Sequence, residues 1–344
     1  MAPTDRDVDI PPLALTMGEP GGIGPDITVA IWAKRRVLCP PVFYCLSDPD
    51  MLAERAAALG VDCPIEIVAP EDAADCIDKA LPVVRLEKPV KATPGLLDSA
   101  NAPAVIEAIA RAVGDVRSGA AAAVVTNPIN KKALYDAGFN HPGHTEFLGV
   151  LSAAWTGKPG TPVMMLAGPD LKAVPVTIHI PLRDVPAVLT EALIVETASI
   201  VATDLRKRFA IARPRLAMTG LNPHAGEGGA FGDEEDRIIR PAIAALRESG
   251  LEATGPHSAD AMFYPTARTA YDAAICMYHD QALIPAKTLS FAETVNVTLG
   301  LAFVRTSPDH GTALDIAGTG NADPASLGAA LRLAGELTRN QLAA

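Results

Sequence analysis

Short apolar runs alternate with amphipathic stretches along the chain. The runs at 13–17, 42–46 and 121–126 are mainly apolar and end at turn-forming residues, which is typical of buried strands. The stretch at 101–116 repeats its apolar residues every three to four positions, which predicts an amphipathic helix. Strands that alternate with helices predict an α/β protein with a largely parallel sheet.

The second half of the chain continues this rhythm. Apolar runs at 163–166 and 171–178 predict two adjacent strands, joined as a hairpin across 167–170. Residues 182–208 predict one long helix. The other expected elements are strands at 215–219, 273–277, 296–299 and 303–305, and helices at 238–250 and 326–344.

Composition narrows the class of protein. The chain has 344 residues, enough for two domains, and its 49% hydrophobic content suits a packed globular protein. The formal net charge of -11 argues against a nucleic-acid-binding surface, which needs basic residues to meet phosphates. The five cysteines form no CxxC pair, which indicates reduced thiols rather than a disulfide framework or a zinc ribbon.

Neither a targeting segment nor a membrane span is expected. The start, 1–9, is polar and acidic and lacks the apolar run of a signal peptide. The longest apolar segment, 185–202, is interrupted by Glu191 and Glu196. We therefore expect a cytoplasmic protein that contacts neither a membrane nor a nucleic acid.

Three of the seven histidines directly follow predicted strands: His179, His224 and His279. Ligands of α/β proteins bind beyond the carboxyl ends of strands, so these imidazoles could converge on one divalent metal. Such a metal would lower the pKa of an alcohol and favour hydride loss. The alternative is that each histidine only orients its own loop by hydrogen bonding.

Two further groups could bind an anion. His144 and Thr145 offer adjacent donors, although Thr145 could instead cap a helix beside a satisfied His144. Lys287, Asn296 and Arg305 are polar positions in a mainly apolar segment and suit a phosphate or carboxylate, unless they only face solvent.

Two acidic residues lie beside the histidine motifs. Asp260, and Asp280 next to His279, are candidates for orienting a ligand or accepting a proton.

Two glycine-containing loops could approach a nucleotide. The loop 18–24 follows a strand and opens a helix, but it has neither the GxGxxG spacing nor the Lys and Ser/Thr of a P-loop. The loop 309–324 concentrates polar residues and glycine turns over a long stretch, as expected of a segment that wraps an adenine and ribose. Its candidate cofactor-binding residues are His310, Gly311, Thr312, Asp315 and Asn321.

With these motifs in order, the chain resembles the 4-hydroxythreonine-4-phosphate dehydrogenase family. The resemblance extends over nearly the whole chain, through the motifs at 15–26, 125–131, 143–147, 220–227, 277–281, 295–301 and 305–313. This chain has Glu19 where the commoner family pattern has Asp, and Asp26 where that pattern has Glu. Both positions therefore keep a negative charge. The loop after Arg305 also resembles the adenosine-binding loop of isocitrate and isopropylmalate dehydrogenases.

The resemblance implies a fold like that of isocitrate and isopropylmalate dehydrogenases, with two α/β lobes and an active-site cleft between them. The expected lobes are 1–130 with 300–344 on the cofactor side, and 131–299 for substrate, metal and dimerisation. The implied reaction is metal-dependent, NAD- or NADP-linked oxidation of 4-phosphooxy-L-threonine in vitamin B6 biosynthesis. Its β-keto acid product decarboxylates to an aminoketone phosphate.

The resemblance also implies roles for residues. One divalent metal per subunit (Zn, Mg or Co) is bound by the three histidines, His179, His224 and His279. Substrate is bound by His144, Thr145, Lys287, Asn296 and Arg305. The family is a homodimer whose shared active sites draw metal ligands from both chains. Lys287 and Asp260 are both candidate proton acceptors.

Other readings of the same residues remain. A dehydrogenase for phosphorylated threonate or erythronate would use the same cation set. A three-histidine zinc hydrolase would activate water instead and would give the loop 309–324 no role. A metabolite-binding module would be stabilised by its ligand without hydride transfer.

Overall fold

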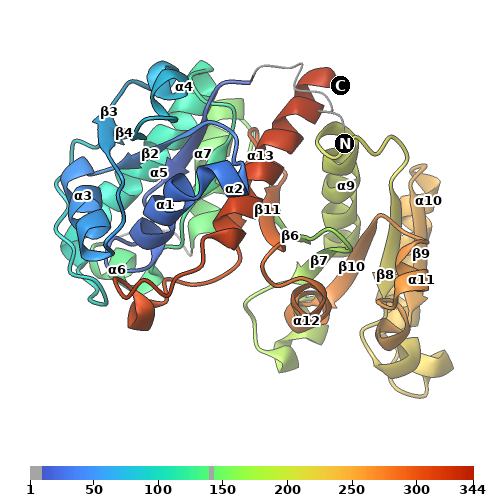
Figure 1. Cartoon of the computed structure of the whole chain (residues 1–344). Helices are drawn as coiled ribbons and strands as arrows, with labels where there is room; N and C mark the ends of the chain where they lie inside the picture. The colour runs from blue at the N-terminus through green and yellow to red at the C-terminus, as the bar shows by residue number, and fades with distance from the viewer. Residues whose placement is uncertain (1–9, 139–142) are drawn as a thin grey trace. The chain divides into compact units, whose positions relative to one another are not determined.

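The computed structural model describes residues 10–138 and 143–344 of the chain. By its internal contacts the chain divides into two compact parts. The first part is Met1–Pro162 with Leu301–Leu342, and the second is Val163–Gly300 with Ala343–Ala344. Each part is an α/β unit with its own run of strands (Figure 1). The predicted α/β class is confirmed.

The first part contains parallel strands in the order β3-β4-β2-β1-β5-β12. These strands are β1 (Leu13–Thr16), β2 (Phe43–Ser47), β3 (Ile65–Ile67), β4 (Leu81–Arg85), β5 (Val124–Thr126) and β12 (Arg305–Pro308). Its α-helices are α1 (Gly24–Ala33), α2 (Arg35–Leu38), α3 (Pro49–Ala58), α4 (Ala73–Cys76), α5 (Ala102–Ser118), α6 (Lys131–Asp136), α7 (His144–Thr156) and α13 (Ala325–Ala343). Short 3-10 turns are η1 (Pro70–Asp72), η2 (Ser99–Asn101) and η7 (Leu314–Ile316).

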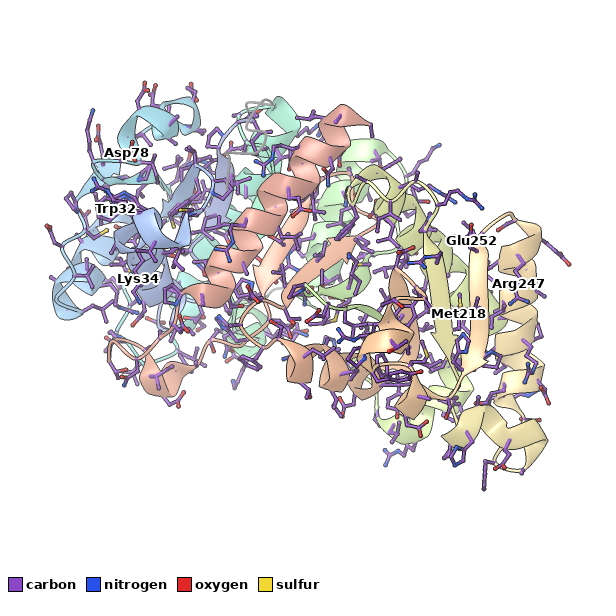
Figure 2. All side chains as sticks on the ribbon, turned by 45° about the vertical axis from the view of Figure 1, so that its right-hand side comes forward. Trp32, Lys34, Asp78, Met218, Arg247 and Glu252 are labelled. Carbon is purple, nitrogen blue, oxygen red and sulfur yellow. The ribbon has the colours of Figure 1, made fainter. Side chains whose placement is uncertain are left out.

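Buried strands explain the apolar runs of the first part. Every residue of β1 and β2 is buried, as expected for parallel strands covered on both faces. Asp48 caps α3 by accepting the amide of Asp50 at 2.9 Å. On α1 the indole of Trp32 donates to the carbonyl of Ile77 at 2.9 Å, which ties this helix to the turn after α4 (Figure 2).

The second part contains strands in the order β11-β6-β7-β10-β8-β9. They are β6 (Val163–Ala167), β7 (Lys172–Thr177), β8 (Arg215–Thr219), β9 (Glu252–His257), β10 (Ala273–Tyr278) and β11 (Val295–Leu299). Strand β6 is antiparallel to β11 and β7, which confirms the predicted hairpin, and the other pairs are parallel. The helices are α8 (Val185–Val188), α9 (Glu191–Lys207), α10 (Arg240–Glu248), α11 (Pro265–Arg268) and α12 (His279–Leu289). Short turns are η3 (Leu182–Asp184), η4 (Pro223–Gly229), the π-helical η5 (Glu235–Ile239) and η6 (Ala259–Ala261).

Three predictions about elements were wrong. The single helix at 182–208 is broken, because Leu189 is extended and the side chain of Thr190 caps a new helix at the amide of Leu193. Strand β9 was missed, since it lies at the edge of the sheet and most of its residues are not buried. The strand expected at 303–305 instead begins at Arg305.

Within the described residues, no single helix is long and apolar enough to cross a membrane. The segments Leu182–Val188 and Glu191–Lys207 pass the same test only as a pair bent by 93°.

Candidate active site

The start of α7 has no side-chain cap among the described residues. Gly143 is its N-cap residue and provides no side-chain hydrogen bond, and His144 and Thr145 are the first two helical residues. The N-terminus of a helix carries a partial positive charge and free amides, which favour a phosphate or carboxylate. The alternative in which Thr145 caps the helix is therefore wrong.

Arg305 is a buried cation in the first part. Its exposed fraction is 5%, and its guanidinium donates to the hydroxyl of Thr126 at 2.6 Å. Burial lowers the pKa of Arg305 to about 10, although the nearby charge of Asp309 opposes the shift. The alternative in which this residue only faces solvent is wrong for Arg305.

His144 lies in the field of two cations. Burial, then the charges of Arg305 and Lys131, hold the pKa of His144 well below its ordinary value. Its Nε2 atom is buried and has no hydrogen-bond partner among the described residues. A buried polar atom of this kind is costly unless a ligand or water completes it. The neutral imidazole, Arg305 and Lys131 together suit an anionic ligand.

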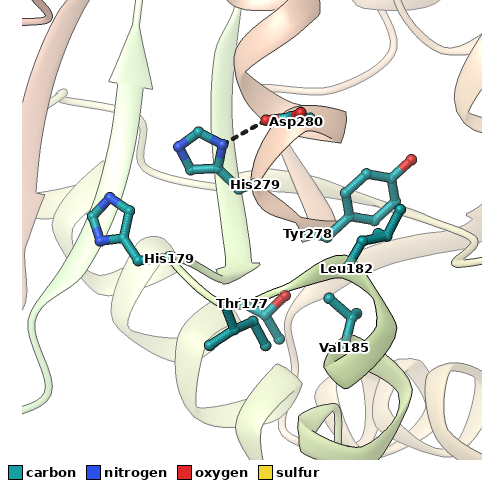
Figure 3. Close-up of a pocket in the computed structure, with 8 residues that line it drawn as sticks. Thr177, His179, Leu182, Val185, Tyr278, His279 and Asp280 are labelled. Atoms are coloured by element: carbon teal, nitrogen blue, oxygen red, sulfur yellow. Dashed lines mark hydrogen bonds and ion pairs between the residues drawn. The ribbon is translucent and has the colours of Figure 1, made fainter.

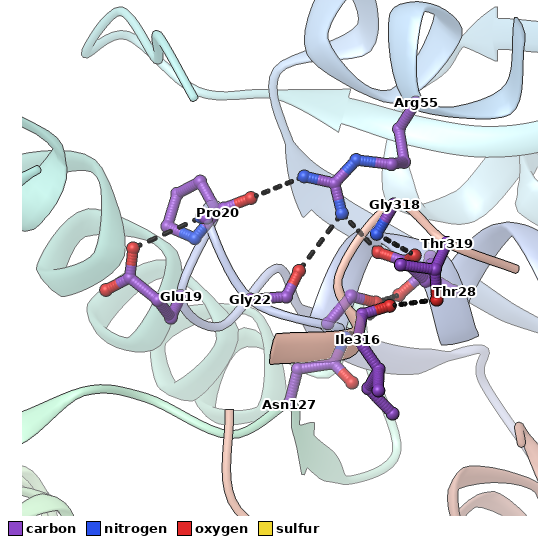
Figure 4. Close-up of polar contacts among 12 residues, drawn as sticks. Glu19, Pro20, Gly22, Thr28, Arg55, Asn127, Ile316, Gly318 and Thr319 are labelled. Carbon is purple, nitrogen blue, oxygen red and sulfur yellow. Dashed lines mark hydrogen bonds and ion pairs between the residues drawn. The ribbon is translucent and has the colours of Figure 1, made fainter. Parts of the chain in front are cut away.

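The loop expected to hold the cofactor packs against the glycine loop at 18–24. The amide of Gly318 donates to Oδ1 of Asp26 at 2.7 Å, and the amide of Ile23 donates to the carbonyl of Thr312 at 2.9 Å. Asp26 also forms an ion pair with Arg55, and both side chains are buried. Arg55 in turn donates to the carbonyls of Pro20 and Gly22, each at 3.0 Å (Figure 4).

Glycines allow this close approach. A Cβ at Gly22 would lie 2.7 Å from the carbonyl oxygen of Thr312, and one at Gly21 would overlap the carbonyl of Leu96. The glycine loop therefore serves as packing for the loop after β12. The absence of side chains at Gly21 and Gly22 leaves room for these contacts.

The candidate cofactor residues remain accessible on that loop. Asp315 and Asn321 are exposed, and a Cβ at Gly311 would meet no atom within 4 Å. Nδ1 of His310 lies 3.1 Å from the carbonyl of Gly311, whereas its Nε2 is buried without a partner in the described chain. The backbone of Thr312 is held by Ile23. These positions offer donors and acceptors to a nucleotide.

Two of the three candidate metal ligands lie together in the second part. His179 follows β7 and His279 follows the neighbouring strand β10, and their ring centroids are 5.7 Å apart (Figure 3). Both border a cavity of about 240 Å³ that Thr177, Leu182 and Tyr278 also line. Two imidazoles at this separation can contribute to one divalent-metal site.

Asp280 orients one of these rings. Its Oδ1 lies 2.7 Å from Nδ1 of His279. A carboxylate on one imidazole nitrogen fixes the ring and leaves the other nitrogen for a metal. Asp280 therefore lies where a residue that orients His279 would lie, as the sequence suggested.

His224 lies apart from this pair. It is exposed on η4, after β8, and lines a second cavity of about 410 Å³ with Asp260 and Ser258, which borders Tyr278 as the first cavity does. Within the described residues, 10–138 and 143–344, no three metal-ligating side chains lie close enough together to hold one metal ion. The described chain by itself therefore does not assemble the three-histidine set.

The remaining candidates also lie in the second part. A hydrogen bond from Ser258 at 2.5 Å lowers the pKa of Asp260, so this side chain is a carboxylate at neutral pH. Lys287 lies on α12 and Phe291 follows that helix, and Nζ of Lys287 is 5.7 Å from the ring centroid of Phe291. Asn296 is partly buried on β11.

Sequence reasoning missed Lys131 and Thr126 as neighbours of the anion-binding residues. Both lie in or beside the quoted motif at 125–131, so their position was a usable signal. Glu235 and Gln281, which hold the loops of His224 and His279, were also missed because neither contact is visible from spacing.

Comparison with known proteins identifies the family. The profile of the pyridoxal phosphate biosynthetic protein PdxA matches residues 38–334. The chain belongs to this family. The 4-hydroxythreonine-4-phosphate dehydrogenase of Bradyrhizobium diazoefficiens is 58% identical over 334 residues, which cover 95% of this chain and 96% of that protein. The enzyme of the same name from Xanthobacter autotrophicus is 54% identical over 327 residues, covering 95% and 93%.

Solved structures agree with the PdxA assignment. The crystal structure of 4-hydroxythreonine-4-phosphate dehydrogenase from Klebsiella pneumoniae has a TM-score of 0.82 and 37% identity, covering 95% of this chain and 99% of that one. A structure of the same name from Burkholderia phymatum has a TM-score of 0.79 and 36% identity, covering 96% and 99%. Dehydrogenase names among PdxA relatives imply a nicotinamide cofactor and do not favour the zinc hydrolase.

Proposed function

We propose that the chain oxidises the C3 hydroxyl of 4-phosphooxy-L-threonine with NAD or NADP, as a step of pyridoxal 5'-phosphate biosynthesis. The product is 2-amino-3-oxo-4-phosphooxybutanoate, which loses carbon dioxide to give 3-amino-2-oxopropyl phosphate. The observation that carries this proposal is the buried cation Arg305 beside a neutral His144, in a chain of the PdxA family.

The assigned substrate-binding residues suit a phosphorylated acid. His144, Thr145, Lys287, Asn296 and Arg305 supply N–H and O–H donors and two cations. Charge-assisted hydrogen bonds to phosphate or carboxylate are roughly twice as strong as neutral ones. A desolvated guanidinium such as Arg305 gains more from an anion than an exposed one does, because the local dielectric is low.

The oxidation moves a hydride and a proton to different acceptors. The hydride leaves C3 for the nicotinamide ring, and the hydroxyl proton passes to a base. Lys287 and Asp260 are the two candidates, and the hydrogen bond from Ser258 lowers the pKa of the Asp260 carboxyl, which favours its ionised form. We propose His310, Gly311, Thr312, Asp315 and Asn321 as the residues that bind the adenosine half of the cofactor.

We propose that His179, His224 and His279 hold one divalent cation (Zn, Mg or Co). The fit is partial within one chain, since His179 and His279 lie together and His224 does not. We therefore assign His224 of a second copy as the third ligand. The cation would polarise the substrate oxygen and stabilise negative charge that develops on it.

We propose a homodimer, and the second part has large exposed apolar side chains that an interface could cover. Leu182, Ile284 and Phe291 are 63–66% exposed, and Phe231 and Tyr264 about half. Large apolar side chains at the surface are typical of interaction sites when they cluster.

Mixed dimers test the shared site. His224→Ala and His279→Ala homodimers should both be inactive. After the two are unfolded together and refolded, one of the two sites in each mixed dimer regains an intact set of histidines. Recovery of activity on mixing supports shared ligands, whereas mixtures as inactive as the parents would refute them.

Substrate comparison tests the reaction itself. We expect NAD(P)H formation with 4-phosphooxy-L-threonine at a kcat/KM well above that with phosphorylated threonate or erythronate. A preference for either sugar acid would move the chain to that reaction. If the protein turned over none of these phosphorylated hydroxy acids, the proposal would be refuted.

A further inference from the structure

The loop that carries His224 has an unusual backbone. From His224 to Gly228 every φ is positive, between 41° and 78°, and three of these residues (His224, Ala225 and Glu227) have side chains. Left-handed backbone is unfavourable for residues that carry a Cβ, because the Cβ approaches the following carbonyl oxygen. Strained backbone persists only where the surroundings hold it, and it is concentrated at functional sites.

Glu235 provides much of that support. Its Oε1 accepts the amides of Leu221 and Asn222, both at 2.8 Å, and its Oε2 accepts Nδ2 of Asn222 at 3.0 Å. The side chain is 2% exposed and makes no ion pair within the described part of the chain. A Cβ at Gly226 would lie 2.6 Å from Oε2, so the turn packs directly on this carboxylate.

The helix that presents Glu235 is itself irregular. Residues Glu235–Ile239 form a π-helical turn that leads into α10. Such turns are rare and occur frequently at functional sites.

Gln281 joins this loop to the one that carries His279. Its Oε1 accepts the hydroxyl of Thr219 at 2.6 Å and the amide of Met277 at 2.7 Å, and its Nε2 donates to the carbonyl of Gly220 at 2.8 Å. Thr219 ends β8, Met277 belongs to β10, and Gln281 is two residues beyond His279 on α12. The starts of both histidine segments are thus bonded to one buried amide.

We infer that Glu235 and Gln281 are positioning residues, which fix the segments that present His224 and His279 to the divalent cations of the two shared sites. This inference rests on the proposed function, because it takes both histidines as metal ligands. Neither side chain needs to touch the cation. Glu235 holds the strained turn in place, and Gln281 sets the register between the two strand ends.

Glu235→Gln is the most selective change. The amide keeps the size of the carboxylate, but its NH₂ group must face one of the N–H donors that Glu235 now accepts. We expect the Kd for Co²⁺, measured by visible absorption on the full-length protein stripped of metal, to rise on the order of tenfold or more, as for other residues that orient metal ligands. The kcat at saturating Co²⁺ should change less than the Kd.

Glu248→Gln is the matched control. Glu248 is exposed at the end of α10 in the same part, and this variant should bind Co²⁺ as the wild type does. If Glu235→Gln binds Co²⁺ as tightly as the control, the positioning role is overturned. If Glu235→Gln does not melt cooperatively, Asn222→Ala replaces it, since it removes only the side-chain bonds to Glu234 and Glu235. An unchanged Co²⁺ affinity in that variant overturns the role, and a weakened one supports it.

The outcomes separate this inference from the proposed reaction. The wild type could make no NADH while His224→Ala and Glu235→Gln both bind Co²⁺ more weakly than the wild type does. That result would refute the reaction and support the positioning role. Wild-type protein that binds no Co²⁺ while it makes NADH would overturn the positioning role and leave the reaction.

Discussion

The glycine loop at 18–24 and the candidate anion-binding group (His144, Arg305 and Lys131) use polar residues in opposite ways. Around the glycine loop, Asp26 and Arg55 are buried against each other and against backbone groups of Pro20, Gly22 and Gly318. At the anion-binding group, Nε2 of His144 is buried with no partner among the described residues. The Asp26–Arg55 pair is satisfied by the protein itself, whereas Nε2 of His144 is not.

Whether a buried polar atom has a partner distinguishes a structural region from a candidate binding site better than the sequence motif does. The glycine loop resembles a nucleotide loop by position, yet its donors and acceptors already serve the protein. His144 looks like an ordinary helix-start residue, yet its environment keeps it neutral and next to two cations. Polar atoms that folding leaves unsatisfied indicate where a ligand completes the structure.

The largest expected effect is on the scaffold. Arg55→Met leaves the carboxylate of Asp26 buried without its cation, which should lower the free energy of unfolding by about 3–5 kcal/mol. Urea unfolding followed by circular dichroism measures this. The double variant Asp26→Asn with Arg55→Met should recover part of the loss. An unchanged urea midpoint for Arg55→Met would break the comparison.

The next effect is on substrate binding. Arg305→Met removes a charge-assisted contact, so KM for the phosphorylated substrate should rise about 10- to 100-fold. KM for NAD should change little, and the melting temperature should not fall much, because a desolvated charge is removed with the side chain. Equal losses for substrate and NAD would contradict the anion-binding role of Arg305.

A smaller effect concerns the pH dependence of stability. Because the pKa of His144 is lowered in the folded protein, the unfolded chain binds this proton first as the pH falls below about 6.5. Between pH 7.5 and 5.5 the wild type should therefore lose about 1.4 kcal/mol more unfolding free energy than His144→Gln. Parallel pH profiles for the two proteins would show that His144 is not held neutral.

The smallest effect sharpens the contrast between glycines. Gly311→Ala places a methyl group in open space, so stability should stay within about 0.5 kcal/mol of the wild type, while KM for NAD rises a few-fold. Gly22→Ala is the opposing control, because its methyl group meets the carbonyl of Thr312 and should destabilise the fold. A Gly311→Ala variant with normal KM for NAD would remove Gly311 from the cofactor site.

Periodicity predicted most of the fold. Strands such as β1 and β2, helix α5, and the hairpin of β6 and β7 were expected close to their observed bounds. The misses have physical causes: a helix at 182–208 was broken by the extended Leu189, and the edge strand β9 has little apolar pattern.

The candidate site was predictable only in part. Strand ends located His179 and His279 correctly near each other, because β7 and β10 are neighbours. His224 lies on the left-handed turn after β8, and no spacing rule predicts this turn. The buried setting of Arg305 and the contacts of Glu235 arise from tertiary packing and could not be read from sequence.

The most direct test of the central claim is NADH formation by purified protein with NAD and 4-phosphooxy-L-threonine, with and without a metal chelator. We predict NADH formation that stops with the chelator and returns when a divalent cation is added in excess. No NADH with any added cation would contradict the dehydrogenase assignment. NADH formation that the chelator leaves unchanged would contradict the metal-binding role of the three histidines.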